Sequence, residues 1–327
     1  MPTPASKPKS ARPADASKRA FRCVAVIGKF RGQGLTQPLR ELADFLAGLG
    51  VKVLLEAGTA RQIRQRDHAP VSMDDIGRQA DVAIVVGGDG TMLGVARQLA
   101  AYEVPLIGIN QGRLGFMTDI ALSRQLETLT PMMRGAYVSE QRSLLQARVE
   151  RRVGKGKASK IKTIFEAIAL NDVVVARGAV SGMIEISVEI NGLYTYTQRA
   201  DGLIIATPTG STAYALSAHG PILHPGLQGL VLVPVAPQSL SNRPIVVPED
   251  SEIVVTLDQL ANSAPHPASA SFDMQNLATL KEGDRIVVRR SPHKITFLHP
   301  ADYNYFGVLR QKLNWTLMPV GAAQANP

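Results

Sequence analysis

The sequence is poor in cysteine, in aromatic residues and in long apolar runs. Its 327 residues include one cysteine, Cys23, which excludes an internal disulfide and suits a reducing compartment. No apolar run approaches the roughly 18 residues that a membrane-spanning helix needs. The N-terminus also lacks the apolar segment of a secretory signal. We therefore expect a cytoplasmic protein without a membrane partner.

Positive charge is concentrated in two segments. The formal net charge is +9, to which residues 1–20 contribute +4 and residues 151–162 contribute +6, so the rest of the chain is close to neutral. The first segment is rich in Pro, Ala, Ser and Lys, a composition typical of a disordered tail. No recognition helix and no pattern of basic and aromatic residues accompanies the charge. We therefore predict no nucleic-acid partner.

The pattern of apolar runs changes near residue 135. Before it, short apolar runs alternate with helical patterns, which predicts a Rossmann-like parallel α/β domain. After it, β-rich runs follow one another with turn residues between them, which predicts an antiparallel β-sandwich. Asn191-Gly192 between two of these runs predicts a two-residue hairpin turn. Phe306, Leu309 and Leu313 then recur at helical spacing, and we expect this C-terminal helix to return to the first domain. The expected parts are a disordered basic tail (1–20), an α/β domain (21–135), an all-β domain (136–300) and a C-terminal segment packed on the first domain (301–327).

Residues 81–94, DVAIVVGGDGTMLG, place the carboxylate of Asp89 in a glycine turn after an apolar strand. Thr91 is expected to cap a helix that starts at Met92. A strand, a glycine turn and a helix N-terminus together direct backbone N–H groups at an anion, which favours phosphate. Asp89 beside a phosphate suits a base or a metal contact. A plain tight turn is the alternative.

A second glycine loop follows the β-rich run 202–206. It has the sequence Thr207-Pro-Thr-Gly-Ser-Thr212 and precedes a helical pattern at 213–218. This is again an anion site by geometry, although Ser and Thr are also common as ordinary helix caps. Two such loops in one chain predict a cleft for a molecule with several phosphates.

Several motifs together resemble the bacterial NAD kinases. They are GGDGT at 87–91, GINQGRLGF at 108–116, Asn171-Asp172, RADGL at 199–203, TPTGSTAY at 207–214 and HGPILH at 219–224. The resemblance covers nearly everything from Phe21 to Met318. The combination is far more specific than either glycine loop alone.

The resemblance implies transfer of the ATP γ-phosphoryl group to the 2′-hydroxyl of the adenosine ribose of NAD⁺, which produces NADP⁺. Asp89 would accept the hydroxyl proton, and Gly90 would let the backbone approach the sugar. A divalent metal cation, Mg²⁺, is expected with ATP. Members of the family are usually homo-oligomers, so a dimer or tetramer is also expected.

The other motif residues of the family carry over to positions of this chain. Asn171 and Asp172 would contact adenosine, although an ordinary turn is an equal alternative for this pair. Asp201 is suited to a carboxamide, Tyr214 to packing on a ring, and Arg199 to a preference for NAD over NADH, with a surface arginine as the plainer interpretation. The remaining expected NAD contacts are Thr212, Ala213, Ala215, Leu216, Ser217, Ala236 and Gln275.

The chain departs from the family pattern at Met274, which stands where the family often has glycine and brings the Gln275 contact into question. The six histidines, among them His219 and His224, show no metal-ligand spacing, so we predict no metal-binding residues and read the histidines as loop or surface residues.

Two alternatives remain open. Lipid kinases and sugar-phosphate kinases share the Gly-Gly-Asp-Gly turn, but Leu93-Gly94 replaces the Asn-Glu pair usual in lipid kinases. A catalytically silent NAD-binding regulator is the non-enzyme alternative, against which the intact Asp89 weighs.

Overall fold

A computed structural model describes residues 20–29, 32–64, 69–112, 114–154, 158–177, 183–260 and 268–315. The expected disordered tail, apart from Ala20, lies outside these residues, as do three positions of the basic segment 151–162. The chain divides into unit 1, Met1–Glu140 with Thr296–Pro327, and unit 2, Gln141–Ile295. Strands β7 (Tyr137–Val153) and β18 (Arg285–Pro300) each begin in one unit and end in the other.

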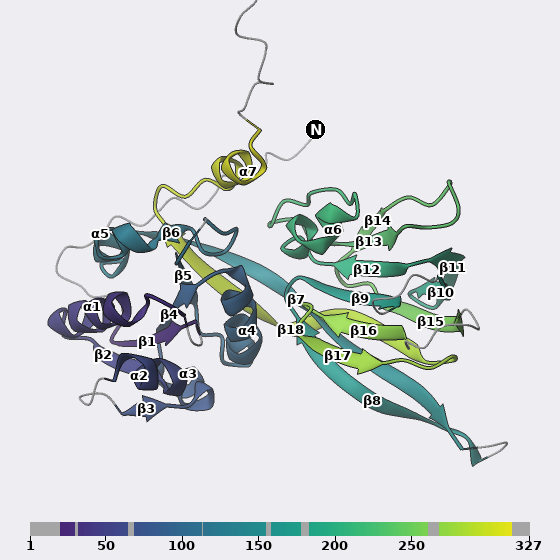
Figure 1. The fold of residues 1–327 in the computed structure, drawn as a ribbon, viewed down its shortest axis with the longest axis horizontal. Coiled ribbons are helices and arrows are strands. Elements are labelled where there is room, and N and C mark those ends of the chain that lie inside the picture. Colours follow the sequence, from purple (N-terminus) through teal and green to yellow (C-terminus); the bar gives the residue numbers. More distant parts are fainter. Residues whose placement is uncertain are drawn as a thin grey trace, which may run out of the picture. The chain divides into compact units, whose positions relative to one another are not determined.

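Unit 1 is built on a parallel sheet with the strand order β5-β4-β1-β2-β3 (Figure 1). Phe297 of β18 and the short strand β6 also pair parallel with β5. The strands are β1 (Cys23–Gly28), β2 (Lys52–Glu56), β3 (Pro70–Val71), β4 (Val82–Gly87), β5 (Leu106–Asn110) and β6 (Ile120–Ala121). The helices are α1 (Thr36–Gly48), α2 (Ala57–Ile63), α3 (Met73–Gln79), α4 (Asp89–Leu99), α5 (Gln125–Met132) and α7 (Tyr305–Leu313). The predicted α/β domain is confirmed.

The apolar pattern explains the position of the glycine turn. All six residues of β4 are buried, because helices cover both faces of a parallel sheet. The strand order reverses direction between β1 and β4, and in open α/β sheets ligands bind outside the carboxyl ends of the strands at such a point. The glycine turn therefore lies where this fold places its ligands.

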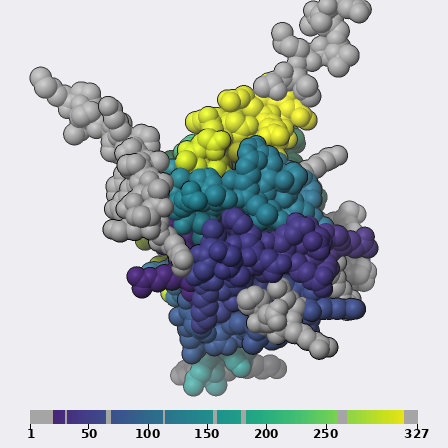
Figure 2. Space-filling model, turned by 90° about the vertical axis from the view of Figure 1, so that its left-hand side faces the viewer, coloured from purple at the N-terminus to yellow at the C-terminus, as the bar shows by residue number. Residues whose placement is uncertain are grey.

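Two details of unit 1 differ from the sequence prediction. Helix α4 has Gly88 as its N-cap and begins at Asp89, so the carboxylate is part of the first helical turn and Thr91 is not the cap. The C-terminal helix belongs to unit 1 as predicted and buries Val308 and Leu309, but Phe306 is 57% exposed. Figure 2 shows this segment, in yellow, against the teal surface of the same unit.

Unit 2 is a sandwich of two sheets, as predicted. One sheet has the order β11-β10-β15-β18, extended by β7 and β8, and the other has the order β14-β13-β12-β9-β16-β17. Apolar residues from both sheets form one buried cluster. The strands introduced here are β8 (Lys160–Ala169), β9 (Asp172–Arg177), β10 (Ile184–Ile190), β11 (Leu193–Ala200), β12 (Gly202–Ala206), β13 (Gly229–Val235), β14 (Ile245–Pro248), β15 (Ile253–Leu260), β16 (Ala268–Phe272) and β17 (Asn276–Thr279).

Turn chemistry explains one hairpin of unit 2 that the sequence predicts and one that it does not. Asn191 and Gly192 both have positive φ, as a two-residue turn requires, and they join β10 to β11. Strands β16 and β17 were missed, because the first is rich in Ala and Ser and the turn between them, Asp273-Met274, contains no glycine.

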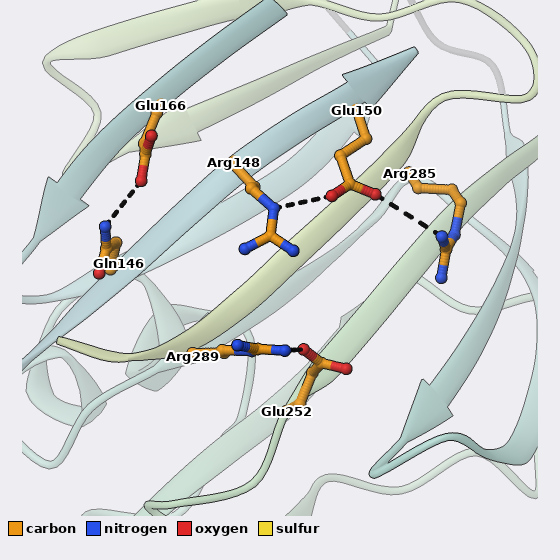
Figure 3. A network of polar contacts seen from close by, with 7 residues as sticks. All are labelled: Gln146, Arg148, Glu150, Glu166, Glu252, Arg285 and Arg289. Atoms are coloured by element: carbon orange, nitrogen blue, oxygen red, sulfur yellow. Dashed lines mark hydrogen bonds and ion pairs between the residues drawn. The ribbon is translucent and has the colours of Figure 1, made fainter. Parts of the chain in front are cut away.

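Arginines on β7 and β18 are matched by carboxylates. Figure 3 shows Arg148 and Arg285 with Glu150 at 2.7 and 3.6 Å, Arg289 with Glu252, and Gln146 with Glu166 at 2.6 Å. Glu150 is half-buried, whereas Arg289 and Glu166 are exposed, and exposed pairs contribute at most about 1 kcal/mol each. Since the charges cancel locally, we assign no anion site to this face.

No helix in the described parts of the chain is both long enough and apolar enough to span a bilayer.

Candidate active site

The carboxylate of Asp89 is held by the segment that follows β5. Its Oδ2 accepts a hydrogen bond from the backbone N–H of Phe116 at 2.9 Å. Its Oδ1 accepts from the N–H of Met117 at 3.2 Å and from the hydroxyl of Thr118 at 3.1 Å. Hydrogen bonds to an ionised acceptor are the strong ones in proteins, so this carboxylate has one fixed orientation.

Gly115 makes that orientation possible. A Cβ on this residue would lie 2.1 Å from Asp89 Oδ1 and 2.2 Å from Thr118 Oγ1, far inside van der Waals contact. Thr118 is itself fixed, since its Oγ1 also accepts from the Asn110 side-chain amide at 2.8 Å. Because Gly115 has no Cβ, it leaves the space that the Asp89 carboxylate occupies.

A cavity of about 620 Å³ opens beside the N-terminus of α4 in unit 1. Gly88 and Gly90 line it, and a Cβ on either glycine would meet nothing within 4 Å. Neither glycine has a positive φ, so neither a close packing contact nor backbone strain requires glycine at these positions. Lys29 and Arg61 supply positive charge at the cavity wall. Asp89 is not among the lining residues.

In unit 2, Asp273 organises the pair Asn171-Asp172. Its carboxylate accepts from the backbone N–H groups of Leu170, Asn171 and Asp172 at 3.0, 2.7 and 3.2 Å. Asp273 is 5% exposed, and its own N–H donates to the carbonyl of Asp172. The turn that carries Gln275 is thus bound directly to the expected adenosine contacts.

The second glycine loop packs on the same pair. The Thr207 hydroxyl donates to the carbonyl of Leu170 at 2.6 Å, and the Thr207 N–H donates to that of Asn171 at 2.9 Å. A Cβ at Gly210 would lie 2.1 Å from the carbonyl oxygen of Asn171. Residues 170–172, 207–211 and 273–275, which are distant in the sequence, therefore converge in unit 2.

Asp172 is 2% exposed and pairs with no hydrogen-bond donor through Oδ1 among the described residues. Burial, and after it the charge of Asp273, raises the pKa of Asp172 to about 7. A carboxyl group in this state is poised to gain or lose a proton near neutral pH.

The remaining expected contacts lie on or near the helix that follows the second loop. Thr212 ends a short 3₁₀ turn (Gly210–Thr212), and α6 spans Tyr214–Ser217. Tyr214 and Ser217 are exposed, Ala215 is buried, and Thr212, Ala213 and Leu216 are half-buried. Ser217 and Ala236 line one largely apolar cavity of about 500 Å³, and Ala236 has a φ of 44°. Asp201 is exposed at the turn between β11 and β12.

Two expected contacts have surroundings that the sequence did not predict. The Arg199 guanidinium lies 2.6 Å from the Glu185 carboxylate on the neighbouring strand, which agrees with the surface-arginine interpretation. Gln275 is exposed, beside a turn in which Asp273 and Met274 have φ of 51° and 55°. Met274 thus keeps the turn that a glycine would favour, in a left-handed conformation that side chains disfavour.

Sequence reasoning missed several residues that the structure connects to the site. Asp273, Gly115 and Thr118 hold predicted site residues in place. Each lies in or next to a motif of the family, and only that position could have identified it from the sequence. His299 was read with the other histidines as a surface or loop residue, which is wrong, because it is 1% exposed. No group of three His, Cys, Asp or Glu residues suitable for a metal ion occurs within the described ranges.

Comparison with known proteins gives matches along most of the chain. A family model described as the ATP-NAD kinase N-terminal domain matches residues 24–137, and one described as the ATP-NAD kinase C-terminal domain matches residues 170–300. An NAD kinase of Polaromonas naphthalenivorans is 52% identical over 298 residues, 91% of this chain and 98% of its own. An NAD kinase of Bordetella avium is 53% identical over 299 residues, 91% of this chain and 97% of its own.

Solved structures show the same fold. A yeast NADH kinase complexed with NADH aligns with a TM-score of 0.78 at 22% identity, covering 91% of this chain and 89% of its own. An Archaeoglobus fulgidus NAD kinase in complex with ATP aligns with a TM-score of 0.65 at 24% identity, covering 88% and 99%.

Proposed function

The chain belongs to the ATP-NAD kinase family, and from that premise we propose how its residues divide the work of the reaction. The reaction transfers the γ-phosphoryl group of ATP to the 2′-hydroxyl of the adenosine ribose of NAD⁺ and produces NADP⁺. In phosphoryl transfer the protein mainly positions the reactants and neutralises charge. The residues of interest are therefore those that hold phosphates, hold the ribose and accept one proton.

We assign to Asp89 the role of general base, which accepts the proton of the ribose 2′-hydroxyl. Three donors from residues 116–118 and the missing Cβ of Gly115 keep its carboxylate in one orientation. Oδ1 accepts two of these hydrogen bonds and Oδ2 accepts one, so a second lone pair of Oδ2 is available to the ribose hydroxyl. Fixed orientation is what a general base needs, because the hydroxyl must meet it within hydrogen-bond distance. This clamp on Asp89 is the observation that carries the proposal.

We assign the triphosphate of ATP to the cavity beside α4. Gly88 and Gly90 leave open space at the helix N-terminus, where backbone N–H groups favour an anion. Lys29 and Arg61 add two cations to the same wall. The N-terminus of α2 is not available in the same way, because the Glu56 carboxylate already accepts from Gly58 and Thr59 there.

We assign NAD to the converging segments of unit 2. Asn171 and Asp172 would contact adenosine and ribose hydroxyls, and Asp201 the carboxamide. The other proposed contacts are Gly90, Arg199, Thr212, Ala213, Tyr214, Ala215, Leu216, Ser217, Ala236 and Gln275. Asp172 is almost fully buried, so its contact with a ligand requires that its surroundings open.

The metal, the assembly and the compartment are further parts of the proposal. A Mg²⁺ ion bound with ATP would be held mainly by the phosphates, where it would neutralise developing charge. We propose a homo-oligomer, a dimer or tetramer, and the exposed Leu193 and Tyr194 at the edge strand β11 give it an apolar contact surface. The reduced Cys23 is compatible with the cytoplasm. The boundaries 21–135, 136–300 and 301–327 stay predictions.

The test is NADP⁺ formation by the full chain with NAD⁺, ATP and Mg²⁺. Arg61→Gln should raise the KM for ATP by about tenfold, the effect of roughly 1.4 kcal/mol of lost binding, with little change in the KM for NAD⁺. Lys52→Gln is the matched control, because it also removes one positive charge. Lys52 is exposed at the start of β2, does not line the cavity, and donates a hydrogen bond to Gln79. An unchanged KM for ATP in Arg61→Gln would remove this cavity as the triphosphate site. Absence of NADP⁺ with intact NAD⁺ binding would favour the regulator.

A further inference from the structure

His299, near the end of β18, is enclosed by acidic and aromatic side chains of unit 1. Its Nδ1 lies 3.0 Å from Asp119 Oδ2, and its Nε2 lies 3.4 Å from Glu140 Oε2, a longer and weaker contact. The ring of Tyr303 stacks on the imidazole with 3.9 Å between centroids and an interplanar angle of 11°. The His299 side chain is 2% exposed and that of Asp119 is 6% exposed. Asp119 Oδ1 is buried without a hydrogen-bond partner in the described part of the chain.

The charges of this cluster favour the imidazolium form. Burial alone lowers the pKa of His299, but the hydrogen bond to Asp119 and the charges of Asp119 and Glu140 outweigh burial, and the pKa is raised above its ordinary value. The titratable groups that face the ring are these two carboxyl groups and the phenol of Tyr303. A buried carboxylate that loses its cation is strongly destabilised, so Asp119 depends on His299 for its place.

Asp119 belongs to the segment that holds Asp89. Residues 116–118 donate three hydrogen bonds to the Asp89 carboxylate, and Asp119 is the next residue along the chain. The segment is therefore fixed at one end by Asp89 and at the other by His299.

We propose that His299 is a positioning residue for phosphoryl transfer, which fixes residues 115–119 through Asp119 and thereby orients the carboxylate of Asp89. The proposal rests on the proposed role of Asp89 as the base. His299 itself contacts neither Asp89 nor, in this account, either substrate. Its effect is therefore on turnover more than on substrate binding.

The first experiment measures kcat and KM for His299→Gln, Asp89→Asn and the double variant in the full chain. His299→Gln should lower kcat by about 10- to 100-fold, the usual effect of removing a residue that orients a catalytic group, with little change in either KM. In the Asp89→Asn background the same change should have almost no further effect, because there is no base left to orient. His293→Gln, on the same strand and half-buried, is the matched control.

A purely structural role would give a different result. If His299→Gln lowers kcat by the same factor with and without Asp89, it acts on the fold and not through the base, and the proposal is wrong. Wild-type kcat in His299→Gln together with an inactive Asp89→Asn would also overturn it, while leaving the base in place. Wild-type kcat in Asp89→Asn would remove the base and this proposal together.

The second measurement is made first on the wild-type protein. With isotope-labelled histidine, the NMR signal of His299 should titrate above the ordinary histidine pKa of about 6.5. The kcat of the wild type should decline as the pH rises through the pKa of His299, and His293→Gln should keep the decline. If His299→Gln does not fold, Asp119→Asn replaces it in the kinetic series, with the same expected loss. A His299 signal that titrates below the ordinary histidine pKa would refute the pairing of a His299 cation with Asp119.

Discussion

The replacement Asp89→Asn tests both roles of this residue, because the side chain is an anchor as well as the proposed base. The carboxylate accepts three hydrogen bonds, from Phe116 N, Met117 N and Thr118 Oγ1. Asparagine has one acceptor oxygen, so its NH₂ group must face at least one backbone N–H. A hydrogen bond to a charged group is worth about 1.5–3 kcal/mol and an unsatisfied buried donor costs about 1–3 kcal/mol. For this half-buried site we expect a loss of about 1–3 kcal/mol in the free energy of unfolding.

The loss of activity should be larger than the loss of stability can explain. A missing general base typically lowers turnover by about 10²- to 10⁴-fold. The assay is NADP⁺ formation at saturating NAD⁺ and ATP, at a temperature where urea unfolding shows the variant to be fully folded. Thr118→Val is the matched control, since it removes one of the three contacts but keeps the carboxylate.

Two results would contradict this reasoning. Turnover near that of the wild type in Asp89→Asn would exclude Asp89 as the base. If Thr118→Val were as inactive as Asp89→Asn, the function of Asp89 would be to anchor residues 116–118, and the base would have to be another group.

Three further changes test the surroundings of the two site regions. Gly115→Ala should lower kcat by about 100-fold, because its Cβ would displace Asp89 Oδ1, and a misplacement of a catalytic group by about 1 Å has an effect of that size. Gly112→Ala is the control and should keep the wild-type kcat, since a Cβ there meets nothing within 4 Å. Equal kcat values for the two variants would contradict this prediction. Met274→Gly should raise the free energy of unfolding, measured with urea, by about 0.5–1 kcal/mol. The change removes the strain of a side chain on a left-handed backbone, which outweighs the larger chain entropy of glycine in the unfolded state. A lower free energy of unfolding would show that the contact between Ser271 and the Met274 sulfur contributes more than this strain costs. The pKa of Asp172 is raised in the folded state, so wild-type stability should fall as the pH rises from about 4 to about 7 and then level off. Asp172→Asn should remove this slope and be about 2–4 kcal/mol more stable at pH 8, and a variant less stable than the wild type at that pH would show that the buried charge is compensated.

The sequence predicted the parts of the fold that depend on local patterns. The buried strands β1 and β4 are apolar throughout, β5 is apolar up to Ile109, and the Asn191-Gly192 turn has a specific backbone requirement, so each could be recognised without tertiary information. Strands β16 and β17 could not, because Ala and Ser have little strand preference and a Met in a left-handed turn is not a turn signal. The predicted start of α4 is three residues late, because glycine and aspartate are weak helix formers. Packing against β4 determines where this helix begins.

The candidate site shows the same division. Motif residues such as Asp89 and Asn171 were identifiable because they occur in short, recognisable segments. Their supports were not, because each acts across a long sequence separation: Thr118 on Asp89, Asp273 on Asn171 and His299 on Asp119. A histidine at the end of a strand has no local feature that distinguishes an ion pair in the interior from a surface position.

The connection of β18 to unit 1 has a consequence for biosynthesis. Phe297 pairs with Leu106 of β5 and His299 is the partner of Asp119, yet more than half of the chain separates these residues from the glycine turn. During translation, which proceeds at about 5–20 residues per second, the first unit emerges from the ribosome long before the strand that completes it. Until then, Leu106 of β5 lacks its strand partner Phe297, and Asp119 lacks His299. A chain that ends before residue 296 would retain both glycine loops and lack His299, the partner of Asp119.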